Sequence, residues 1–378
     1  MYLTKVKRKI LIASLLKPVN DIRSYEKIAF SLARNQIYDI YCSGFPSETL
    51  SKNENIHLLP LSYFKRNGVG RFLARFKTLY IYIKLKPELI IVNSPDLLII
   101  SSLYKILFGA KIIYDIQENY FRNLWFQKNY SWGIRHLLAC FVRAKELITS
   151  PLFNHYFLAE KIYVKQLHFT KNKFSLLENK SLKTSNYRIN TNLNNSLNFL
   201  ICGTIAKEYG IFEGVNFYKQ ILKLKPNAEL TIIGHCPNRV TYKQLVSLTK
   251  NNSLIKLEVS NNPIPHTKIE KAIIQAHVGL LPYLPHKSTE GKWPTKVYEF
   301  MAFKLPFIIQ QNSLWNDIIL QYNVGLSFDF TSNNLQNTYD FWPNFESSSF
   351  YSKKLPNDIY WDSQEKELQN QIDILFKK

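Results

Sequence analysis

The segment 265–310 holds the densest set of residues that could do chemistry, because a proline-rich loop there leads into a predicted helix, Thr295–Phe303. We expect Thr295 to cap that helix and Lys296 to lie in its first turn, with Glu299 one turn further on the same face. A first-turn lysine opposes the helix dipole, and it is favourable there only beside an anion. The spacing therefore predicts a phosphate-binding site, and its alternative is a plain capped helix with a solvated Glu299.

The elements that would position this site are two series of continuous Ile/Leu/Val runs separated by helical stretches. Strands buried on both faces have this pattern, which is typical of parallel sheets between layers of helices. The first series is Ile10–Ser14, Ile37–Cys42, Ile56–Leu59, Leu89–Asn93, Lys111–Asp115 and Glu146–Ser150; the second is Asn198–Cys202, Ala228–Ile233, Leu254–Val259, Val278–Leu281 and Phe307–Gln310.

A polar stretch between the two series predicts two domains, as does the length of 378 residues. We expect an N-terminal domain over 1–185, a linker over 186–196, a C-terminal domain over 197–355 and a closing helix within 356–378. Ligands of such sheets bind at the carboxyl ends of the strands, so the cleft between the domains is the expected site.

Composition narrows the class of protein. The hydrophobic fraction of 46% indicates a globular chain, and the four cysteines form no C-x-x-C pair, which fits a reducing cytosol. No run is long enough to span a bilayer. The sequence also lacks G-x-S-x-G, Walker, H-E-x-x-H and G-x-G-x-x-G motifs, which disfavours hydrolases, ATPases, metalloproteases and ordinary dehydrogenases.

A resemblance to a known family covers nearly the whole chain. The segment P-T-K-V-Y-E-F-M-A-F-K-L-P-F-I, which starts at Pro294, resembles the donor-binding segment of GT-B glycosyltransferases, especially the retaining family 4. Four more segments are similar to parts of that family in the family's order: K-P-V-N-D-I-R-S-Y-E-K-I-A-F-S-L-A, I-I-Y-D-I-Q-E-N-Y, L-N-F-L-I-C-G-T-I-A-K-E-Y-G-I-F-E-G-V and A-E-L-T-I-I-G-H. The order of the five matches carries the resemblance more than any single motif.

The resemblance implies an α/β GT-B fold, in which two Rossmann-like domains face each other across a cleft and the C-terminal helix packs back on the N-terminal domain. It implies a nucleotide-sugar donor in the C-terminal domain and a glycan acceptor in the N-terminal domain. The implied donor-binding residues are Gly203, Thr204, Gly234, His235, Pro294, Thr295, Lys296 and Glu299. The implied catalytic residues are Lys296, Glu299 and Lys207, and those for the acceptor or sugar are Arg23, Asp115, Gln117, Glu118 and His286.

The sequence departs from the family pattern at three places. Relatives often carry E-x7-E, but position 291 is glycine and Glu290 is one residue out of register; no arginine accompanies Lys207; and Gln117 stands where a histidine is common. Gln117 can still bond a sugar hydroxyl but cannot transfer a proton. The resemblance implies retention, and the sequence offers no obvious enzymic nucleophile. We therefore expect a front-face transfer in which Lys296 and Lys207 stabilise the leaving diphosphate. No metal or other cofactor is expected, since no D-x-D motif ends a strand.

Three alternatives to a glycosyltransferase stay open. A sugar-nucleotide 2-epimerase would share the fold but would need a cleft set of carboxylates and histidine that the sequence does not supply. A catalytically inactive relative would bind nucleotide-sugar or glycan without turnover. A nucleic-acid binder would explain the net charge of +21, but no motif of that class is present, so nucleic acid is not an expected partner.

The basic charge is concentrated in residues 1–190, which hold 30 Lys and Arg against 12 Asp and Glu. A coding bias towards lysine is the plain explanation, but it would enrich both halves. We expect Arg71, Phe72, Arg75, Phe76 and Lys77 to face an anionic membrane, unless the aromatic rings simply pack on the sheet. A polyprenyl-diphosphate-linked acceptor would fit this placement, with the protein in the cytoplasm, peripheral on the inner face of the cytoplasmic membrane, making lipopolysaccharide or another cell-surface polysaccharide.

Overall fold

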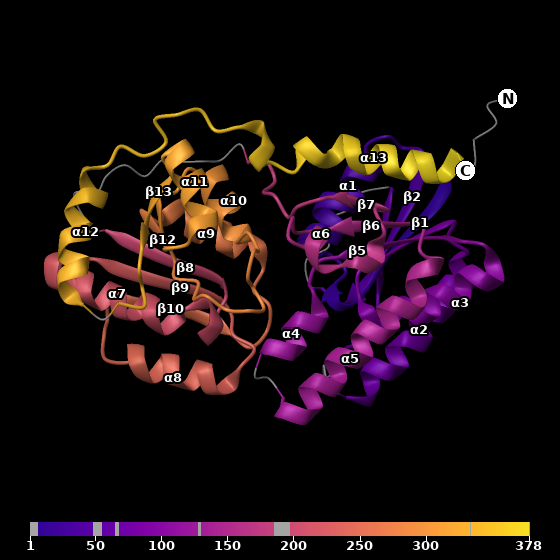
Figure 1. Ribbon diagram of the computed structural model, residues 1–378, viewed down its shortest axis with the longest axis horizontal. Helices are drawn as coiled ribbons and strands as arrows, with labels where there is room; N and C mark the ends of the chain where they lie inside the picture. The colour runs from indigo at the N-terminus through magenta and orange to yellow at the C-terminus, as the bar shows by residue number, and fades with distance from the viewer. Residues whose placement is uncertain are drawn as a thin grey trace. The chain divides into compact units, whose positions relative to one another are not determined.

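The chain forms two compact α/β units, seen in a computed structural model (Figure 1). The described residues are 7–47, 55–64, 68–127, 130–184, 197–332 and 334–377. Unit 1 comprises Met1–Asn179 and Trp361–Lys378, and unit 2 comprises Lys180–Tyr360. The predicted linker, 186–196, lies outside the described residues. Among the described residues, no helix is both long enough and apolar enough to cross a bilayer.

Unit 1 is built on a seven-stranded parallel sheet in the order β3-β2-β1-β4-β5-β6-β7. Its strands are β1 (Arg8–Pro18), β2 (Tyr38–Phe45), β3 (Ile56–Pro60), β4 (Leu89–Val92), β5 (Lys111–Ile116), β6 (His155–Leu158) and β7 (Phe174–Leu176). All four residues of β4 are buried, as the continuous apolar runs predict for a sheet covered on both faces.

Two groups of helices cover the sheet of unit 1. On one face α3 packs between α2 and α5, and on the other α1 packs against α13 (Figure 1). The helices are α1 (Phe30–Ala33), which continues a π-helical turn (Ile22–Ala29), α2 (Val69–Leu85), α3 (Leu98–Phe108), α4 (Tyr120–Phe126), α5 (Trp132–Thr149), α6 (Tyr163–Gln166) and α13 (Asp362–Lys377).

The C-terminal helix belongs to unit 1, as predicted. The buried Trp361 precedes it and donates its indole N–H to Ser31 Oγ at 2.8 Å. The side-chain amide of Gln364 then bonds both the N–H and the C=O of Glu178, each at 2.7 Å. Leu368 and Ile372 are fully buried, so α13 contributes to the core of the unit.

Unit 2 repeats the architecture with six parallel strands in the order β10-β9-β8-β11-β12-β13. The strands are β8 (Asn198–Thr204), β9 (Glu229–His235), β10 (Ile255–Ser260), β11 (Val278–Leu281), β12 (Phe307–Gln310) and β13 (Gly325–Phe328). The helices are α7 (Ile211–Leu224), α8 (Arg239–Thr249), α9 (His266–Gln275), α10 (Thr295–Ala302), α11 (Ser313–Tyr322) and α12 (Leu335–Ser347).

One predicted strand is wrong. Residues 146–149 form the last turn of α5, and the strand that pairs with β5 is β6, which follows Pro151. The prediction assumed that Leu147 and Ile148 are buried, but both are exposed, while Glu146 turns inward and accepts a hydrogen bond from the hydroxyl of Tyr114.

Candidate functional site

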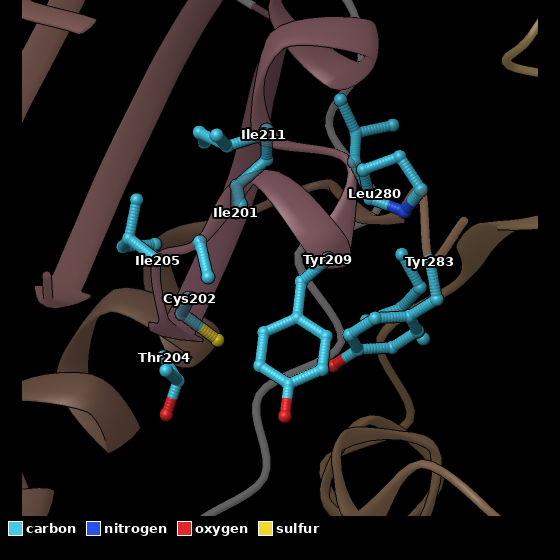
Figure 2. Close-up of a pocket in the computed structure, with 11 residues that line it drawn as sticks. Ile201, Cys202, Thr204, Ile205, Tyr209, Ile211, Leu280 and Tyr283 are labelled. Carbon is cyan, nitrogen blue, oxygen red and sulfur yellow. The ribbon is translucent and has the colours of Figure 1, made fainter. Parts of the chain in front are cut away.

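The strand order of unit 2 reverses between β8 and β11, so the carboxyl ends of these strands form the edge where ligands of such sheets bind. A pocket lies at this edge, lined by residues that include Cys202, Thr204, Tyr209 and Tyr283 (Figure 2). Burial raises the pKa of the Cys202 thiol to about 12, so it stays protonated at neutral pH and is no nucleophile. The pocket therefore offers shape and hydrogen bonds rather than a covalent group.

Two glycines let the backbone pack tightly here. Gly210 has φ +70°, and a Cβ on it would lie 1.7 Å from the carbonyl oxygen of Pro282. Gly203, near the end of β8, has φ +109°, and a Cβ there would lie 2.9 Å from Cε of Lys296. Gly210 is thus required on conformational and steric grounds, and Gly203 chiefly by its positive φ. The contact at Gly203 also brings the end of β8 to the first turn of α10.

Lys296 and Glu299 form a largely buried ion pair on α10. Lys296 Nζ lies 2.5 Å from Glu299 Oε2, and only 11% and 16% of the two side chains are exposed. The predicted cap is wrong, because the cap position is Pro294 and Thr295 is the first helical residue, with no side-chain capping bond. The first-turn lysine is therefore balanced by a carboxylate of its own helix.

His266 joins this pair, and the sequence interpretation missed it. It is the first residue of α9, with Nε2 3.5 Å from Glu299 Oε2 and Nδ1 3.5 Å from Glu270 Oε1. Its position was a usable signal, because α9 follows β10 as α10 follows β11, and both helices begin directly after a proline. Its approach to Glu299 spans separate elements, which no local spacing encodes.

The protonation states of the pair follow from burial and mutual attraction. Burial lowers the pKa of Lys296, but the Glu299 carboxylate outweighs it, and the pKa is raised overall. Burial raises the pKa of Glu299, but Lys296 and His266 outweigh it, and the pKa falls well below its usual range. Lys296 is therefore a fixed cation at neutral pH and not a proton acceptor.

The adjoining strand β9 places two further predicted donor residues beside this group. Gly234 and His235 pair in register with Gly203 and Thr204, and a Cβ on Gly234 would lie 1.9 Å from the carbonyl oxygen of Gly203. His235 Nε2 lies 2.9 Å from the carbonyl oxygen of Asn261. The ends of β8 and β9 thus form one continuous edge with the pocket.

Two other predicted residues of unit 2 lie in loops around the edge. Lys207 is exposed in a short 3₁₀ turn (Lys207–Tyr209) after β8. His286 lies in the loop before α10, where its Nδ1 is 2.7 Å from Oγ of the buried Ser288. The ring of His286 is thus oriented by its own loop.

In unit 1 the structure brings Arg23, Asp115 and Gln117 together. Arg23 bonds both carboxylate oxygens of Asp115, at 2.7–3.1 Å, and the carbonyl of Leu177 at 2.7 Å. Arg23 and Asp115 are almost fully buried, whereas Gln117 is half-buried and donates to Asp115 Oδ2 at 2.8 Å. The arrangement gives the ion pair a positioning role and leaves Gln117 the more accessible member.

Glu118 follows Gln117 at the carboxyl end of β5. It is half-buried, and its Oε2 accepts a hydrogen bond from Asn123 Nδ2 at 3.0 Å. Gln117 and Glu118 are therefore the accessible polar groups among the residues predicted for acceptor binding in this unit.

The five residues predicted to face a membrane divide into two groups on α2. Arg71 and Arg75 both bind the buried Asp96, at 2.5 and 2.6 Å, with about 30% of each side chain exposed. Phe72 and Phe76 are more than half exposed, and Lys77 is exposed. The alternative interpretation, in which these rings pack on the sheet, is wrong for both.

Comparison with known proteins rests on structure, because no family model and no curated protein matches the sequence. Sucrose-phosphate synthase from Thermosynechococcus elongatus has a TM-score of 0.69 at 13% identity, over 98% of this chain and 100% of that one. HepE from Anabaena, solved with UDP and glucose, has a TM-score of 0.61 at 10% identity, over 97% and 99%.

An epimerase shares the same architecture. UDP-GlcNAc 2-epimerase from Methanocaldococcus jannaschii has a TM-score of 0.56 at 11% identity, over 99% of this chain and 100% of that one. At these identities the likeness establishes the fold. The chain has the GT-B fold over nearly its whole length, which confirms the predicted fold class.

Proposed function

We propose that the chain is a glycosyltransferase that takes a sugar from a nucleotide-sugar bound at the β8–β11 edge of unit 2. The observation that carries the proposal is the buried Lys296–Glu299 pair, which meets Gly203 at the point where the strand order reverses. A cation at a helix N-terminus, next to a glycine whose backbone no side chain of its own covers, is suited to binding a diphosphate.

The division of roles follows from the contacts. Lys296 and His266 both approach Oε2 of Glu299. The other oxygen, Oε1, would then accept a hydrogen bond from a ribose hydroxyl of the donor. Lys296, with the exposed Lys207, stabilises the negative charge that grows on the leaving diphosphate. No metal is assigned a part in this step, and the configuration at the transferred carbon is retained.

The proposed acceptor is a glycan carried on polyprenyl diphosphate, and its accepting hydroxyl would lie near Gln117 and Glu118. The basic excess of residues 1–190 supports an anionic lipid carrier. The product would be a cell-surface polysaccharide such as lipopolysaccharide, made on the cytoplasmic face of the membrane.

The test is calorimetric titration with UDP, GDP, ADP, CMP and dTDP, with UDP first because HepE was solved with it. We expect one nucleotide to bind selectively and Lys296→Ala to weaken it, while Lys271→Ala, an exposed lysine on α9, leaves it unchanged. Transfer from the matching nucleotide-sugar should survive EDTA. Failure of all five nucleotides to bind would overturn the proposal.

An epimerase is the second candidate, supported by the structural likeness to the Methanocaldococcus enzyme. Incubation with nucleotide-sugar alone separates the two, because only an epimerase forms the C2 epimer without an acceptor. A protein that binds the nucleotide-sugar but neither epimerises nor transfers it would be the inactive relative.

A further inference from the structure

Helix α2 packs apolar side chains on the core and also carries an apolar stripe on its outward side. Its inward residues include Ala74, Thr78 and Tyr82, which are buried, while the arginines of the same side bind Asp96. Its apolar stripe points outward and follows the 3.6-residue period. The exposed stripe consists of Val69, Phe72, Leu73, Phe76, Tyr80 and Ile83.

Helices α3 and α5 have the same property. Their exposed large apolar residues recur at helical spacing on the side away from the buried ones. The stripe of α3 is Ile99, Leu103, Ile106 and Leu107, and the stripe of α5 is Ile134, Leu137, Phe141, Leu147 and Ile148. Each of these side chains is 46–76% exposed.

The three stripes belong to one layer. Helix α3 packs against both α2 and α5, and the three lie side by side along one face of the sheet of unit 1 (Figure 1). We call the three stripes together the outer helix face. Scattered apolar residues on a surface need no explanation, but a contiguous patch of this kind marks an interaction site.

The charge on these helices indicates the partner. Together α2, α3 and α5 contain eight Lys and Arg and a single acidic residue, Glu146, which is buried. Lys77 and Lys84 are exposed beside the stripe of α2. The outer helix face thus has apolar side chains flanked by cations, and its three helices expose no acidic residue. An anionic bilayer is complementary to such a face, because its acyl chains are apolar and its headgroups are negative.

We propose that the outer helix face docks on an anionic bilayer, with its apolar side chains inserted below the headgroups and Lys77 and Lys84 at headgroup level. Arg71 and Arg75 were expected from the sequence to bind lipid, but both are already paired with Asp96. Insertion of the apolar side chains therefore supplies most of the affinity for the bilayer. A second copy of the chain fits less well, since a two-fold contact through this face would bring like charges together. The inference goes beyond sugar transfer and does not depend on it.

The first experiment is flotation of the full chain with phosphatidylcholine vesicles, with and without phosphatidylglycerol. We expect binding to the anionic vesicles that weakens but persists at physiological salt. The variant Leu137→Asn/Phe141→Asn should bind ~10-fold more weakly or worse, since it removes two apolar insertions. The control, Val240→Asn/Leu320→Asn, changes equally exposed residues of unit 2 and should bind as the unsubstituted chain does.

The chain provides its own depth probe. Cys140 is exposed on α5 among the stripe residues, whereas Cys42, Cys202 and Cys236 are buried. An environment-sensitive fluorophore on Cys140 should shift to the blue with anionic vesicles and should be quenched by lipids brominated in the acyl chain. Quenching through the acyl chain distinguishes insertion from contact with headgroups alone.

Several outcomes would overturn the proposal. One is the absence of binding to anionic vesicles, and another is equal binding by the chain and its Leu137→Asn/Phe141→Asn variant. A third is a dimer in sedimentation that this variant converts to a monomer, which would assign the face to a second copy. Thermal unfolding of the Leu137→Asn/Phe141→Asn and Val240→Asn/Leu320→Asn variants shows whether a loss of vesicle binding reflects misfolding. If it does, the fluorophore on Cys140 of the otherwise unsubstituted chain decides whether the face inserts.

Discussion

The side chain of Lys296 occupies the space in which a side chain on Gly203 would begin. Cε of Lys296 would lie 2.9 Å from a Cβ on Gly203, and Nζ continues from there to the Glu299 carboxylate. The missing Cβ of one strand residue thus sets the path of a cation that starts on a different element. The pairing of Lys296 with Glu299 leaves little freedom for the lysine to move aside.

Gly203→Ala should damage both stability and donor binding. The positive φ of +109° and the contact with Lys296 predict a loss of about 1–3 kcal/mol in the free energy of unfolding, measured by urea titration. Gly133→Ala is the matched control, because a Cβ there meets no atom within 4 Å and alanine favours the helix, so α5 should gain about 0.5–1 kcal/mol. Equal effects of the two substitutions would contradict the packing described.

Glu299→Gln should destabilise the fold as well as weaken the donor, because it leaves the buried Lys296 without its counter-charge. Breaking a buried pair costs about 3–5 kcal/mol, whereas removing both charges costs less. Unfolding of Glu299→Gln, Lys296→Met and the double variant should therefore give a strongly non-additive cycle. Simple additivity would show that the two side chains do not interact.

The stability that Glu299 contributes should depend on pH in one direction. Its pKa in the folded protein lies well below its unfolded value of 4.5, so the contribution is complete above that value and is lost as the pH falls below it. The difference in unfolding free energy between the unsubstituted chain and Glu299→Gln should shrink as the pH falls below about 4.5. A difference that grows on acidification would reverse the assigned sign.

Asp115→Asn should cost about 3–5 kcal/mol of unfolding free energy, because it leaves the Arg23 guanidinium buried and unbalanced. Gln117→Ala removes a half-buried amide and should cost about 1 kcal/mol or less. If Gln117 binds the acceptor, its removal should instead raise the KM for acceptor with the donor KM unchanged. Thermal unfolding and steady-state kinetics on the same samples separate the two roles, and a stable Asp115→Asn would refute the positioning role of the pair.

Buried strands were predictable because their signal is local. Val278–Leu281 and Phe307–Gln310 were predicted at the bounds that the structure has, since each is a short apolar run between turn residues. The same signal failed at Leu147 and Ile148, because an apolar run on a helix that exposes its apolar side looks like a buried strand. The unusual surface of unit 1 caused the error.

The candidate site was predictable where residues lie close in sequence and hidden where they do not. Lys296 and Glu299 are three residues apart, and their spacing already places them on one face. His266 and Gly203 reach the same place from other elements, so only the fold brings them together. The inward orientation of the Arg71 and Arg75 side chains likewise depends on Asp96. That residue follows β4 in the sequence, whereas the two arginines precede β4.

The membership of α13 in unit 1 has a consequence for biosynthesis. Residues 361–378 are translated after all of unit 2, so the buried places of Trp361, Leu368 and Ile372 stay unfilled until that segment has been made. The unit that begins the chain is therefore the last to be completed, and the unit encoded in the middle has all its residues first. A chain truncated after residue 360 would contain all of unit 2 and a unit 1 without the hydrogen bonds that Trp361 makes to Ser31 and Gln364 makes to Glu178.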